Sequence, residues 1–387
     1  MSTPVLSEAS TVEHDAPLAP LTTLQVGGPA RTLVRAGSTD DLVAAVRAAD
    51  EAGEDLLLVS GGSNLVISDA GFAGTVVQVA TRGIELLEDA VPAAGDGGEP
   101  GRSGERVLVR AAAGEPWDGF VAHAVEQGWS GVEALSGIPG RVGSTPIQNV
   151  GAYGQDVSQT IVEVELLDRD SGELERFSAA DCGFAYRDSV FKRTQKGSTG
   201  RYVVLAVTFS LERSELSQPV GYAALAQGLD VAMGERVPLA DARQAVLAQR
   251  RQRGMVWDAD DHDTWSCGSF FTNPIVPGDD APAVLDRIAA RVGDDVAIPT
   301  YRAGTDDTDA AIKLSAGWLI ERAGFHRGHP GPDAAVRLST KHTLALTNRG
   351  AATTAQLLDL AREVRDGVRA RFGVDLHHEP MIVGTAL

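Results

Sequence analysis

The chain has few cysteines and few basic residues, and each shortage argues against a class of protein. Of its 387 residues only Cys182 and Cys267 are cysteines, and they lie far apart, so we expect neither a disulfide framework nor a metal site. Lysine and arginine number 34 against 53 aspartates and glutamates, which gives a net charge of −19. A surface that acidic repels the phosphates of nucleic acids and anionic lipids, so we expect neither as a partner.

Long apolar runs are also missing. No stretch of about eighteen uncharged apolar residues occurs, and the first ten residues lack the basic start and apolar centre of a secretory signal. With so little cysteine, these absences favour a soluble protein in a reducing compartment, and we expect it in the cytoplasm. The length of the chain suggests two or three domains.

The first half of the chain alternates between strand-like and helix-like segments. A strand, a helix capped by Ser38 and a second strand over residues 31–60 are typical of a βαβ unit. Further strands are expected at 107–112, 162–167, 173–177 and 203–211, and a helix is expected at 117–127. The strands at 162–167 and 173–177 are expected to form a hairpin around Asp170-Ser171-Gly172. Residues 91–105, rich in Gly, Glu and Pro, are expected to be a solvated loop.

The second half of the chain is expected to contain more helix than the first half. Beyond about Ser214 we expect mainly helices, at 239–253, 282–292, 313–323 and 353–372, with Gly373 as a C-cap and strands at 343–347 and 381–383. The change predicts a domain boundary near Ser214 and an α+β second part.

Residues 138–154 are too rich in glycine and proline for an ordinary helix or strand. They contain four glycines, two prolines and one charged residue. Glycine lets the backbone approach a bound group closely and proline fixes that approach, so this segment, called the cradle here, is expected to face a ligand. The alternative is a surface loop, but Ile147, Val150 and Tyr153 are poor residues to leave in water. The short Gly61-Gly62-Ser63-Asn64-Leu65 run, directly after a strand, is a second candidate for holding a phosphate.

Three polar residues stand among apolar or glycine-rich neighbours. Arg187 can pair with a carboxylate through two hydrogen bonds, or it can form an ion pair with Asp188. Ser269, between Gly268 and two phenylalanines, can donate a proton from a dry pocket, or its hydroxyl can bond its own backbone in a turn. Glu379 can be a buried acid or a solvated residue at a strand end.

Two other kinds of enzyme are disfavoured by the motifs. The chain has no Gly-X-Ser-X-Gly elbow and no His-Glu-X-X-His pair, which argues against hydrolase and metalloenzyme readings. Cys267 is either a nucleophile or, as is more frequent for such a residue, a buried and inert thiol.

Taken in order, these segments resemble the UDP-N-acetylenolpyruvoylglucosamine reductases, also called UDP-N-acetylmuramate dehydrogenases, in the longer subtype with a lid tyrosine. The matching stretches begin at Thr23-Leu24-Gln25-Val26-Gly27-Gly28-Pro29-Ala30 and continue through the Gly61 run, the cradle, Tyr186-Arg187-Asp188-Ser189, Gly268 to Pro274, Lys313 to Ile320 and His378-Glu379-Pro380. The resemblance therefore covers nearly the whole chain.

The resemblance implies an α+β architecture. It predicts a vanillyl-alcohol-oxidase-like (PCMH-type) FAD-binding fold with a C-terminal α+β substrate-binding domain. The implied divisions are an N-terminal tail at 1–20, an FAD-binding domain at 21–213 with two lobes split near 90, a substrate-binding domain at 214–375, and a C-terminal strand at 376–387 that brings Glu379 to the active site.

It also implies a cofactor and a place for it. FAD is expected to bind non-covalently, since no histidine stands in the Gly61 to Leu65 loop to tether a flavin. The implied cofactor-binding residues are Gly61, Gly62, Ser63, Asn64 and Leu65 near the pyrophosphate, and Gly143, Ser144, Pro146, Gln148, Asn149, Gly151 and Tyr153 along the flavin.

The family's reaction assigns roles to the three polar residues. NADPH reduces the flavin, which then reduces the enolpyruvyl double bond of UDP-N-acetylenolpyruvoylglucosamine to give UDP-N-acetylmuramate in peptidoglycan precursor synthesis. Arg187 and Glu379 match the residues that hold and polarise the substrate carboxylate, and Ser269 matches the proton donor to C2.

The resemblance also implies which residues contact the substrate. Tyr222, Arg253 and Asn273 match positions that contact the diphosphate and uridine, and Lys313 and Lys341 are second candidates for phosphate. The implied partners are the UDP-sugar and NADPH only, with the chain acting as a monomer. Two alternatives stay open, a flavin-dependent hydroxy-acid or alcohol oxidase of the same fold and a non-catalytic flavin or sugar-nucleotide sensor.

Overall fold

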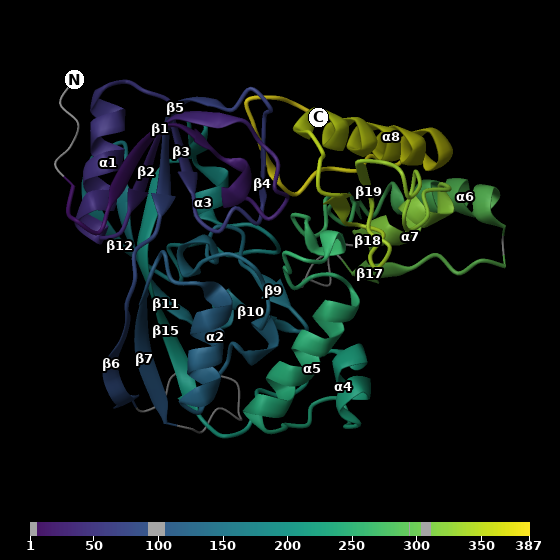
Figure 1. The fold of residues 1–387 in the computed structure, drawn as a ribbon. Helices are drawn as coiled ribbons and strands as arrows, with labels where there is room; N and C mark the ends of the chain where they lie inside the picture. Colours follow the sequence, from purple (N-terminus) through teal and green to yellow (C-terminus); the bar gives the residue numbers. More distant parts are fainter. Residues whose placement is uncertain (1–5, 92–104, 294, 303–310) are drawn as a thin grey trace. The chain divides into compact units, whose positions relative to one another are not determined.

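The computed structural model describes residues 6–91, 105–293, 295–302 and 311–387, and the chain divides into two compact units (Figure 1). Unit 1 comprises residues 1–16, 30–61 and 72–256, and unit 2 comprises 17–29, 62–71 and 257–387. Each unit is described by itself. The loop expected over 91–105 lies almost entirely outside the described residues.

The first sheet of unit 1 is built around one central parallel strand. Its order is β1 (Thr11–Pro17), β2 (Pro29–Ala36), β5 (Phe72–Val79) and β3 (Leu56–Val59). Helix α1 (Thr39–Glu51) connects β2 to β3 and begins at Ser38, whose hydroxyl accepts a hydrogen bond from the Asp41 N–H, so the predicted cap is confirmed. The two strands of the predicted βαβ unit do not pair with each other, because β5 lies between them and runs parallel to both.

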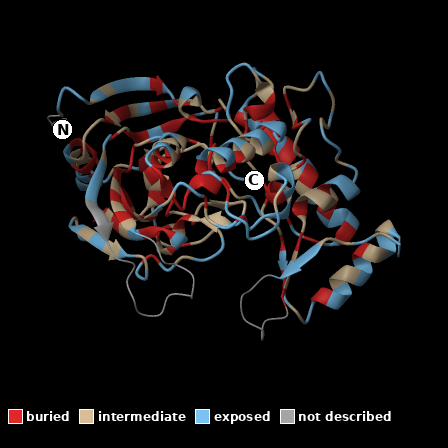
Figure 2. Ribbon diagram, turned by 90° about the horizontal axis from the view of Figure 1, so that it is seen from below, coloured by how far each residue is buried: buried red, intermediate tan, exposed pale blue. Residues whose placement is uncertain are grey.

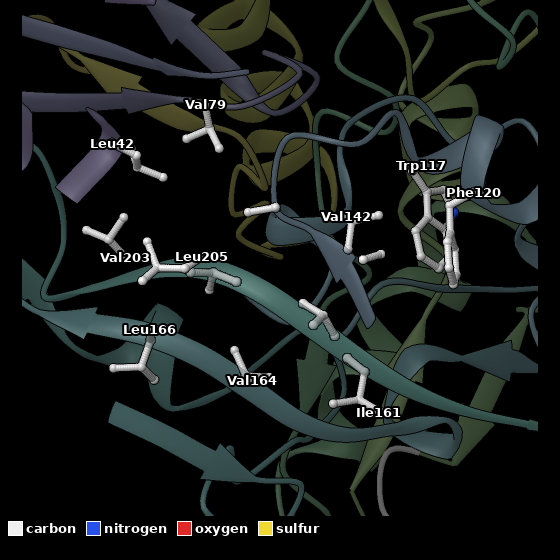
Figure 3. Packing of buried hydrophobic residues seen from close by; sticks show 14 of the residues in the cluster. Leu42, Val79, Trp117, Phe120, Val142, Ile161, Val164, Leu166, Val203 and Leu205 are labelled. Atoms are coloured by element: carbon white, nitrogen blue, oxygen red, sulfur yellow. The ribbon is translucent and has the colours of Figure 1, made fainter. Parts of the chain in front are cut away.

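The second sheet of unit 1 has antiparallel neighbours. Its order is β12 (Leu174–Ser178), β11 (Ile161–Asp168), β15 (Tyr202–Arg213), β7 (Arg106–Ala112) and β6 (Ile84–Val91), with β8 (Trp129–Ser130) also paired to β15. The hairpin predicted around Asp170-Ser171-Gly172 is confirmed as β11 and β12. Between the sheets and helix α2 (Trp117–Glu126) lies one apolar core, in which Trp117, Phe120 and Val164 are fully buried (Figure 3).

Unit 1 also contains the region where the domain boundary was expected. Helices α4 (Ala223–Leu229) and α5 (Leu239–Gln252) belong to unit 1, so the division after Val256 does not coincide with the expected boundary near Ser214. The physical reason is side-chain packing from α5: Arg243 donates two hydrogen bonds to Asp118 of α2, at 2.6 and 2.9 Å. Val246 of the same helix is buried in a small apolar cluster with Ala134 and Val220.

The N-terminal segment is more structured than a tail. Within residues 1–20, strand β1 joins the first sheet, and the 3-10 turn η1 (Ala19–Leu21) follows it. Unit 1 also holds short elements: η2 (Glu133–Leu135), η3 (Val142–Ser144), β9 (Gly151–Ala152), β10 (Gln155–Asp156), η4 (Val157–Gln159), α3 (Val190–Arg193), β13 (Gln195–Lys196) and β14 (Thr199–Gly200).

Unit 2 packs three helices with three small sheets. The helices are α6 (Ala281–Val292), α7 (Ala316–Arg322) and α8 (Thr354–Phe372), and each carries both buried and exposed residues (Figure 2). The strands pair as β16 (Ile275–Val276), β18 (Ile312–Leu314) and β17 (Thr300–Arg302), as β19 (Val336–Leu338) with β20 (Leu346–Asn348), and as β4 (Leu65–Ile67) parallel to β21 (Met381–Val383); η5 (His262–Thr264) completes the unit.

Several boundaries in unit 2 differ from the sequence expectations. The helix predicted from Lys313 begins at Ala316, because Lys313 and Leu314 pair with Ile275 and with Thr300 and Tyr301 in the small sheet and Ser315 caps the helix. The strand predicted at 343–347 is shifted to β20. Gly373 ends α8 in a left-handed conformation, as predicted. No helix in the described part of the chain is both long and apolar enough to cross a membrane.

Candidate active site

The cradle is fastened to the loop that precedes α2. The Val142 N–H donates to the Glu115 carbonyl at 2.9 Å, and the Gly143 N–H donates to the Ala113 carbonyl at 2.8 Å. A Cβ on Gly143 would stand 2.5 Å from the Cβ of Ala113, so the contact requires glycine. The start of the cradle is therefore a fixed backbone surface.

The cradle is irregular, as its composition predicts. Apart from η3 and the two-residue strand β9 it has no regular structure, and Asn149 and Tyr153 have φ values of +47° and +52°. Non-glycine residues rarely adopt this conformation, and such strain tends to concentrate at functional sites. The Asn149 side chain holds the bend, because its oxygen accepts from the Ser158 N–H at 3.1 Å and its nitrogen donates to the Ala185 carbonyl at 3.3 Å.

Arg187 reaches back onto the cradle from the neighbouring segment. Its guanidinium donates to the carbonyl of Gly151 at 2.9 Å and to that of Asn149 at 3.5 Å, and its own φ is +54°. Ser189 ties the same segment down through a 2.6 Å hydrogen bond to the Ile147 carbonyl. Asp188, the partner considered for Arg187, forms an ion pair with Arg193.

Other cofactor-binding candidates lie on or beside this backbone surface. The Ser144 hydroxyl donates to the Arg141 carbonyl at 2.7 Å, and Pro146 is buried. Gly61 lies near the start of the loop that follows β3, and it packs against the cradle: a Cβ there would stand 2.5 Å from the Cα of Gly140. The two glycine-containing segments singled out from the sequence therefore touch within unit 1.

The residues around this contact fit an anionic cofactor such as FAD. Ser60 Oγ and Arg141 Nε are buried, and neither has a hydrogen-bond partner among the described residues. Burial lowers the pKa of Arg141, and the nearby Arg82 and Arg35 lower it further. Buried donors without partners next to clustered positive charge are costly unless an anion satisfies them. The FAD pyrophosphate supplies that charge, so the donor set suits the group.

The remaining part of the Gly61 loop lies in unit 2. Gly62 has a φ of +60°, and a Cβ there would stand 1.9 Å from the Leu21 carbonyl oxygen. Asn64 connects the loop to the C-terminal strand: its carbonyl accepts from the Met381 N–H at 2.9 Å, and its side chain donates to the Glu379 carbonyl at 3.4 Å. Leu65 then begins β4 beside Met381.

Two tyrosines and two arginines form a second cluster in unit 1. The rings of Tyr153 and Tyr222 meet edge to face with centroids 5.4 Å apart, and Gly154 packs against Gly221 beside them. Burial raises the pKa of Tyr153, while the charges of Arg250 and Arg253 lower it. The structure thus brings the predicted residues Tyr222 and Arg253 together with Tyr153.

Ser269 and Glu379 lie on adjacent segments of unit 2. The Glu379 N–H donates to the Phe270 carbonyl at 2.9 Å, and Phe271 pairs with His378. Phe270 and Phe271 are fully buried, and Gly268 has a φ of +77° that begins the turn. The Ser269 hydroxyl makes no hydrogen bond to another described residue, so it is not the backbone-bonded turn serine considered from the sequence. Arg187 belongs to unit 1, and these two residues belong to unit 2.

The other predicted substrate residues of unit 2 have distinct surroundings. The Asn273 side-chain oxygen accepts from the Ala316 N–H at 2.9 Å, which fixes the residue against the start of α7. Lys313 is half-buried on β18 between Ile275 and Tyr301. Lys341 forms an ion pair with Asp261.

Cys267, two residues before Ser269, is a buried thiol. Burial raises its pKa to about 12, and the nearby Glu379 charge adds to the shift. The thiolate is the nucleophilic form of cysteine, and this group forms almost none of it near neutral pH. The inert alternative is therefore the one that the structure supports.

Comparison with known proteins identifies the family. Residues 30–178 match the model of an FAD binding domain, and residues 260–383 match that of the UDP-N-acetylenolpyruvoylglucosamine reductase C-terminal domain. The chain is 54% identical over 367 residues to the UDP-N-acetylenolpyruvoylglucosamine reductase of Salinispora arenicola, covering 95% of this chain and 94% of that one. It is 55% identical over 370 residues to the reductase of Saccharopolyspora erythraea, covering 96% and 95%. The chain belongs to the UDP-N-acetylenolpyruvoylglucosamine reductase family.

A solved structure supports the fold of this family. The UDP-N-acetylenolpyruvylglucosamine reductase of Thermus caldophilus superimposes with a TM-score of 0.59 at 21% identity, over 97% of this chain and 99% of that one. With the FAD binding domain match, it confirms the predicted α+β fold of the vanillyl-alcohol-oxidase type.

In this member of the reductase family, several polar residues of the site escaped the sequence reasoning. Arg250 interacts with Tyr153, and Ser60 and Arg141 carry buried donors without partners among the described residues. Arg141 stood inside the cradle as its one charged residue, and that was the available signal. Nothing in the local pattern marks Ser60, and Arg250 reads as part of a basic helix end.

Proposed function

We propose that Arg187, Ser269 and Glu379 carry the chemistry of an enolpyruvyl reduction in this chain. The chain is an FAD-dependent oxidoreductase of the UDP-N-acetylenolpyruvoylglucosamine reductase family, uses NADPH, and reduces the double bond of UDP-N-acetylenolpyruvoylglucosamine to give UDP-N-acetylmuramate. The residue roles rest chiefly on one observation: the Glu379 N–H donates to the Phe270 carbonyl at 2.9 Å, and the neighbouring Ser269 hydroxyl has no hydrogen-bond partner among the described residues.

The cofactor supplies the hydride and the protein supplies position and protons. When bound, FAD carries hydride from NADPH to C3 of the enolpyruvyl group. The cradle and the Gly61 to Leu65 loop hold the cofactor without a covalent bond, through backbone groups and through Ser60 Oγ and Arg141 Nε, two buried atoms with no partner in the described part of the chain.

Negative charge that develops on the substrate carboxylate is stabilised by the positive charge of Arg187, and Glu379 is the second residue that we propose to hold this carboxylate. The Arg187 guanidinium is pre-oriented by its hydrogen bond to Gly151, so little reorganisation is needed as charge develops. Glu379 lies directly before the buried Pro380 and strand β21, and we propose that it polarises the substrate carboxylate.

Ser269 donates the proton that completes the reduction at C2. Ser269 is half-buried and is followed by two buried phenylalanines, and its hydroxyl makes no hydrogen bond to another described residue that would have to break first. A hydroxyl can serve as the acid because the carbon it protonates is strongly basic and water is excluded.

We further propose how the sugar nucleotide is held. Tyr222 and Arg253, gathered beside Tyr153, contact the diphosphate and uridine, and Asn273 offers its side-chain nitrogen while its oxygen is engaged by Ala316. Lys313 and Lys341 are further candidates for phosphate. The division at 21–213, 214–375 and 376–387, action as a monomer and a cytoplasmic location belong to the same proposal.

The two half-reactions test the residue roles directly. Purified protein should be yellow, and rapid mixing with NADPH should bleach the flavin absorbance. Adding UDP-N-acetylenolpyruvoylglucosamine to the reduced enzyme should restore it without oxygen. If NADPH bleaches the flavin and only oxygen restores it, the chain is an oxidase and the proposal fails.

A further inference from the structure

A carboxyl group buried far from solvent ties together the two chain segments that carry the tyrosine pair. Glu133, in η2, is 1% exposed. Its Oε2 accepts from the Gly131 N–H at 2.6 Å, and its Oε1 accepts from the Gln155 side-chain nitrogen at 2.9 Å and from the Gln218 N–H at 2.6 Å. Burying such a group is costly unless its oxygens accept hydrogen bonds, and here both oxygens do so, from three donors in all.

The first of these ties leads to Tyr153. Gln155 lies on β10, which pairs with β9 around the two-residue turn Tyr153-Gly154. Its amide is held at both ends, because its oxygen accepts from the Ala134 N–H at 2.9 Å while its nitrogen donates to Glu133. The turn that carries Tyr153 therefore has a fixed base.

The second tie leads to Tyr222. The Gln218 N–H, four residues before Tyr222, is held by Glu133, and the Gln218 side chain donates to Ser130 at 2.9 Å and to Glu212 at 2.7 Å. Two residues later the Val220 N–H donates to the Glu235 carbonyl at 2.8 Å. Directly after Val220, Gly221 packs against Gly154, and the rings of Tyr153 and Tyr222 meet with their centroids 5.4 Å apart.

From this geometry we infer that Glu133 is a positioning residue for sugar-nucleotide binding. It touches neither ring, and it fixes one against the other by holding the segments from which both project. This inference rests on the proposed role of Tyr222 in binding the nucleotide. It predicts that loss of the carboxylate weakens the binding of the sugar nucleotide and leaves FAD binding and reduction by NADPH unchanged.

The variant Glu133→Gln tests the inference with a minimal change of shape. An amide at this position must point its NH₂ group at one of the donors, either Gly131 or the pair Gln155 and Gln218. Gln155 cannot turn over to accept without giving up its bond from Ala134. We expect the dissociation constant for UDP-N-acetylenolpyruvoylglucosamine, followed by perturbation of the oxidised flavin spectrum, to rise by about tenfold or more. KM should rise in step while kcat stays near the wild-type value.

Asp41→Asn is the matched control. Asp41 is also a buried carboxyl group that accepts hydrogen bonds only from neutral donors, here Ser7, Ser10 and Ser38, and it lies on α1. Its loss should lower the thermal midpoint as Glu133→Gln does and leave nucleotide affinity unchanged. Equal nucleotide affinity in the two variants would overturn the inference, as would loss of FAD from Glu133→Gln alone.

A second variant keeps the test decisive if Glu133→Gln folds poorly. Gln155→Ala removes only the tie to the Tyr153 turn, so we expect a smaller rise in the dissociation constant and no further rise when it is combined with Glu133→Gln. Full additivity would contradict the shared mechanism. Failure of the proposed function is separately visible, because wild-type protein would then not bind the sugar nucleotide at all.

Discussion

The cradle in unit 1 and the Gly268 to Pro274 segment in unit 2 are both glycine-containing loops, but their polar groups are treated differently. In the cradle, Asn149 and Ser144 are engaged by backbone partners, and Arg187 donates to two of its carbonyls. In the second loop, backbone bonds hold Phe270 on both sides, and the Ser269 hydroxyl has no partner among the described residues. Under the roles proposed above, the residues that bind are fixed by hydrogen bonds to the protein, whereas the proposed proton donor Ser269 has no such bond among the described residues.

The largest effect is expected from removing the Ser269 hydroxyl. In Ser269→Ala we expect reduction of the flavin by NADPH to keep its rate and oxidation by the enolpyruvyl substrate to slow by about a hundredfold to ten-thousandfold, because only the second half-reaction needs that proton. Stopped-flow absorbance measures the two halves separately. Equal slowing of both would assign Ser269 a structural role.

Removing the Arg187 guanidinium, which is hydrogen-bonded to the cradle, should have a smaller effect on the rate. Arg187→Ala should raise the activation free energy by about 2.7 to 4 kcal/mol if it acts as one lost donor to developing charge. Arg187→Lys keeps the charge but cannot reproduce the planar fork that bonds the cradle carbonyls, so it should recover only part of the rate. The measured quantity is kcat, and an unchanged kcat in Arg187→Ala would remove this residue from the chemistry.

Two glycine-to-alanine substitutions, at Gly143 and Gly119, test how closely the cradle backbone packs. Gly143→Ala pushes a methyl to within 2.5 Å of Ala113, and we expect it to cost about 1 to 3 kcal/mol of stability and to lower FAD retention. Gly119→Ala is the matched change on helix α2, where the nearest atom is 3.6 Å away, and it should stabilise by about 0.5 to 1 kcal/mol. Thermal unfolding and the ratio of flavin to protein absorbance report both effects. Full retention of FAD by Gly143→Ala would show that this fit is not needed.

The smallest expected effect concerns the thiols. Burial raises the pKa of both Cys182 and Cys267 to about 12, so a thiol reagent at about pH 8 should modify neither in the native protein and both after unfolding. The thiols become reactive only as the pH rises toward that pKa, because the reactive form is the deprotonated one. Rapid native modification of Cys267 would revive the nucleophile hypothesis. Mass spectrometry counts the modified residues.

Local pattern was enough to predict much of this fold. The cap at Ser38, the hairpin at β11 and β12, the end of α8 at Gly373 and the irregular cradle all depend on residues close in sequence, and all were found. The family resemblance added the fold class, the cofactor and the reaction.

The features that the sequence did not predict depend on packing between distant parts of the chain. The insertion of β5 between β2 and β3, and the packing of α5 within unit 1 through Arg243 and Asp118, depend on partners distant in the chain. Lys313 reads as helical by itself and becomes part of a strand because Ile275 and Tyr301 lie on either side. Arg250 and Glu133 gain their importance from neighbours that the sequence does not place beside them.

The parallel pair of β4 and β21 makes the order of synthesis matter. Residues 65–67 leave the ribosome more than three hundred positions before 381–383, and until then the carbonyl of Asn64 lacks its donor from Met381. Glu379 takes its place beside Phe270 in the same late event. A nascent or prematurely terminated chain whose flavin-binding region has already folded would therefore lack Glu379, a residue proposed to act in the reaction. Under that proposal, turnover begins only after translation has passed this point.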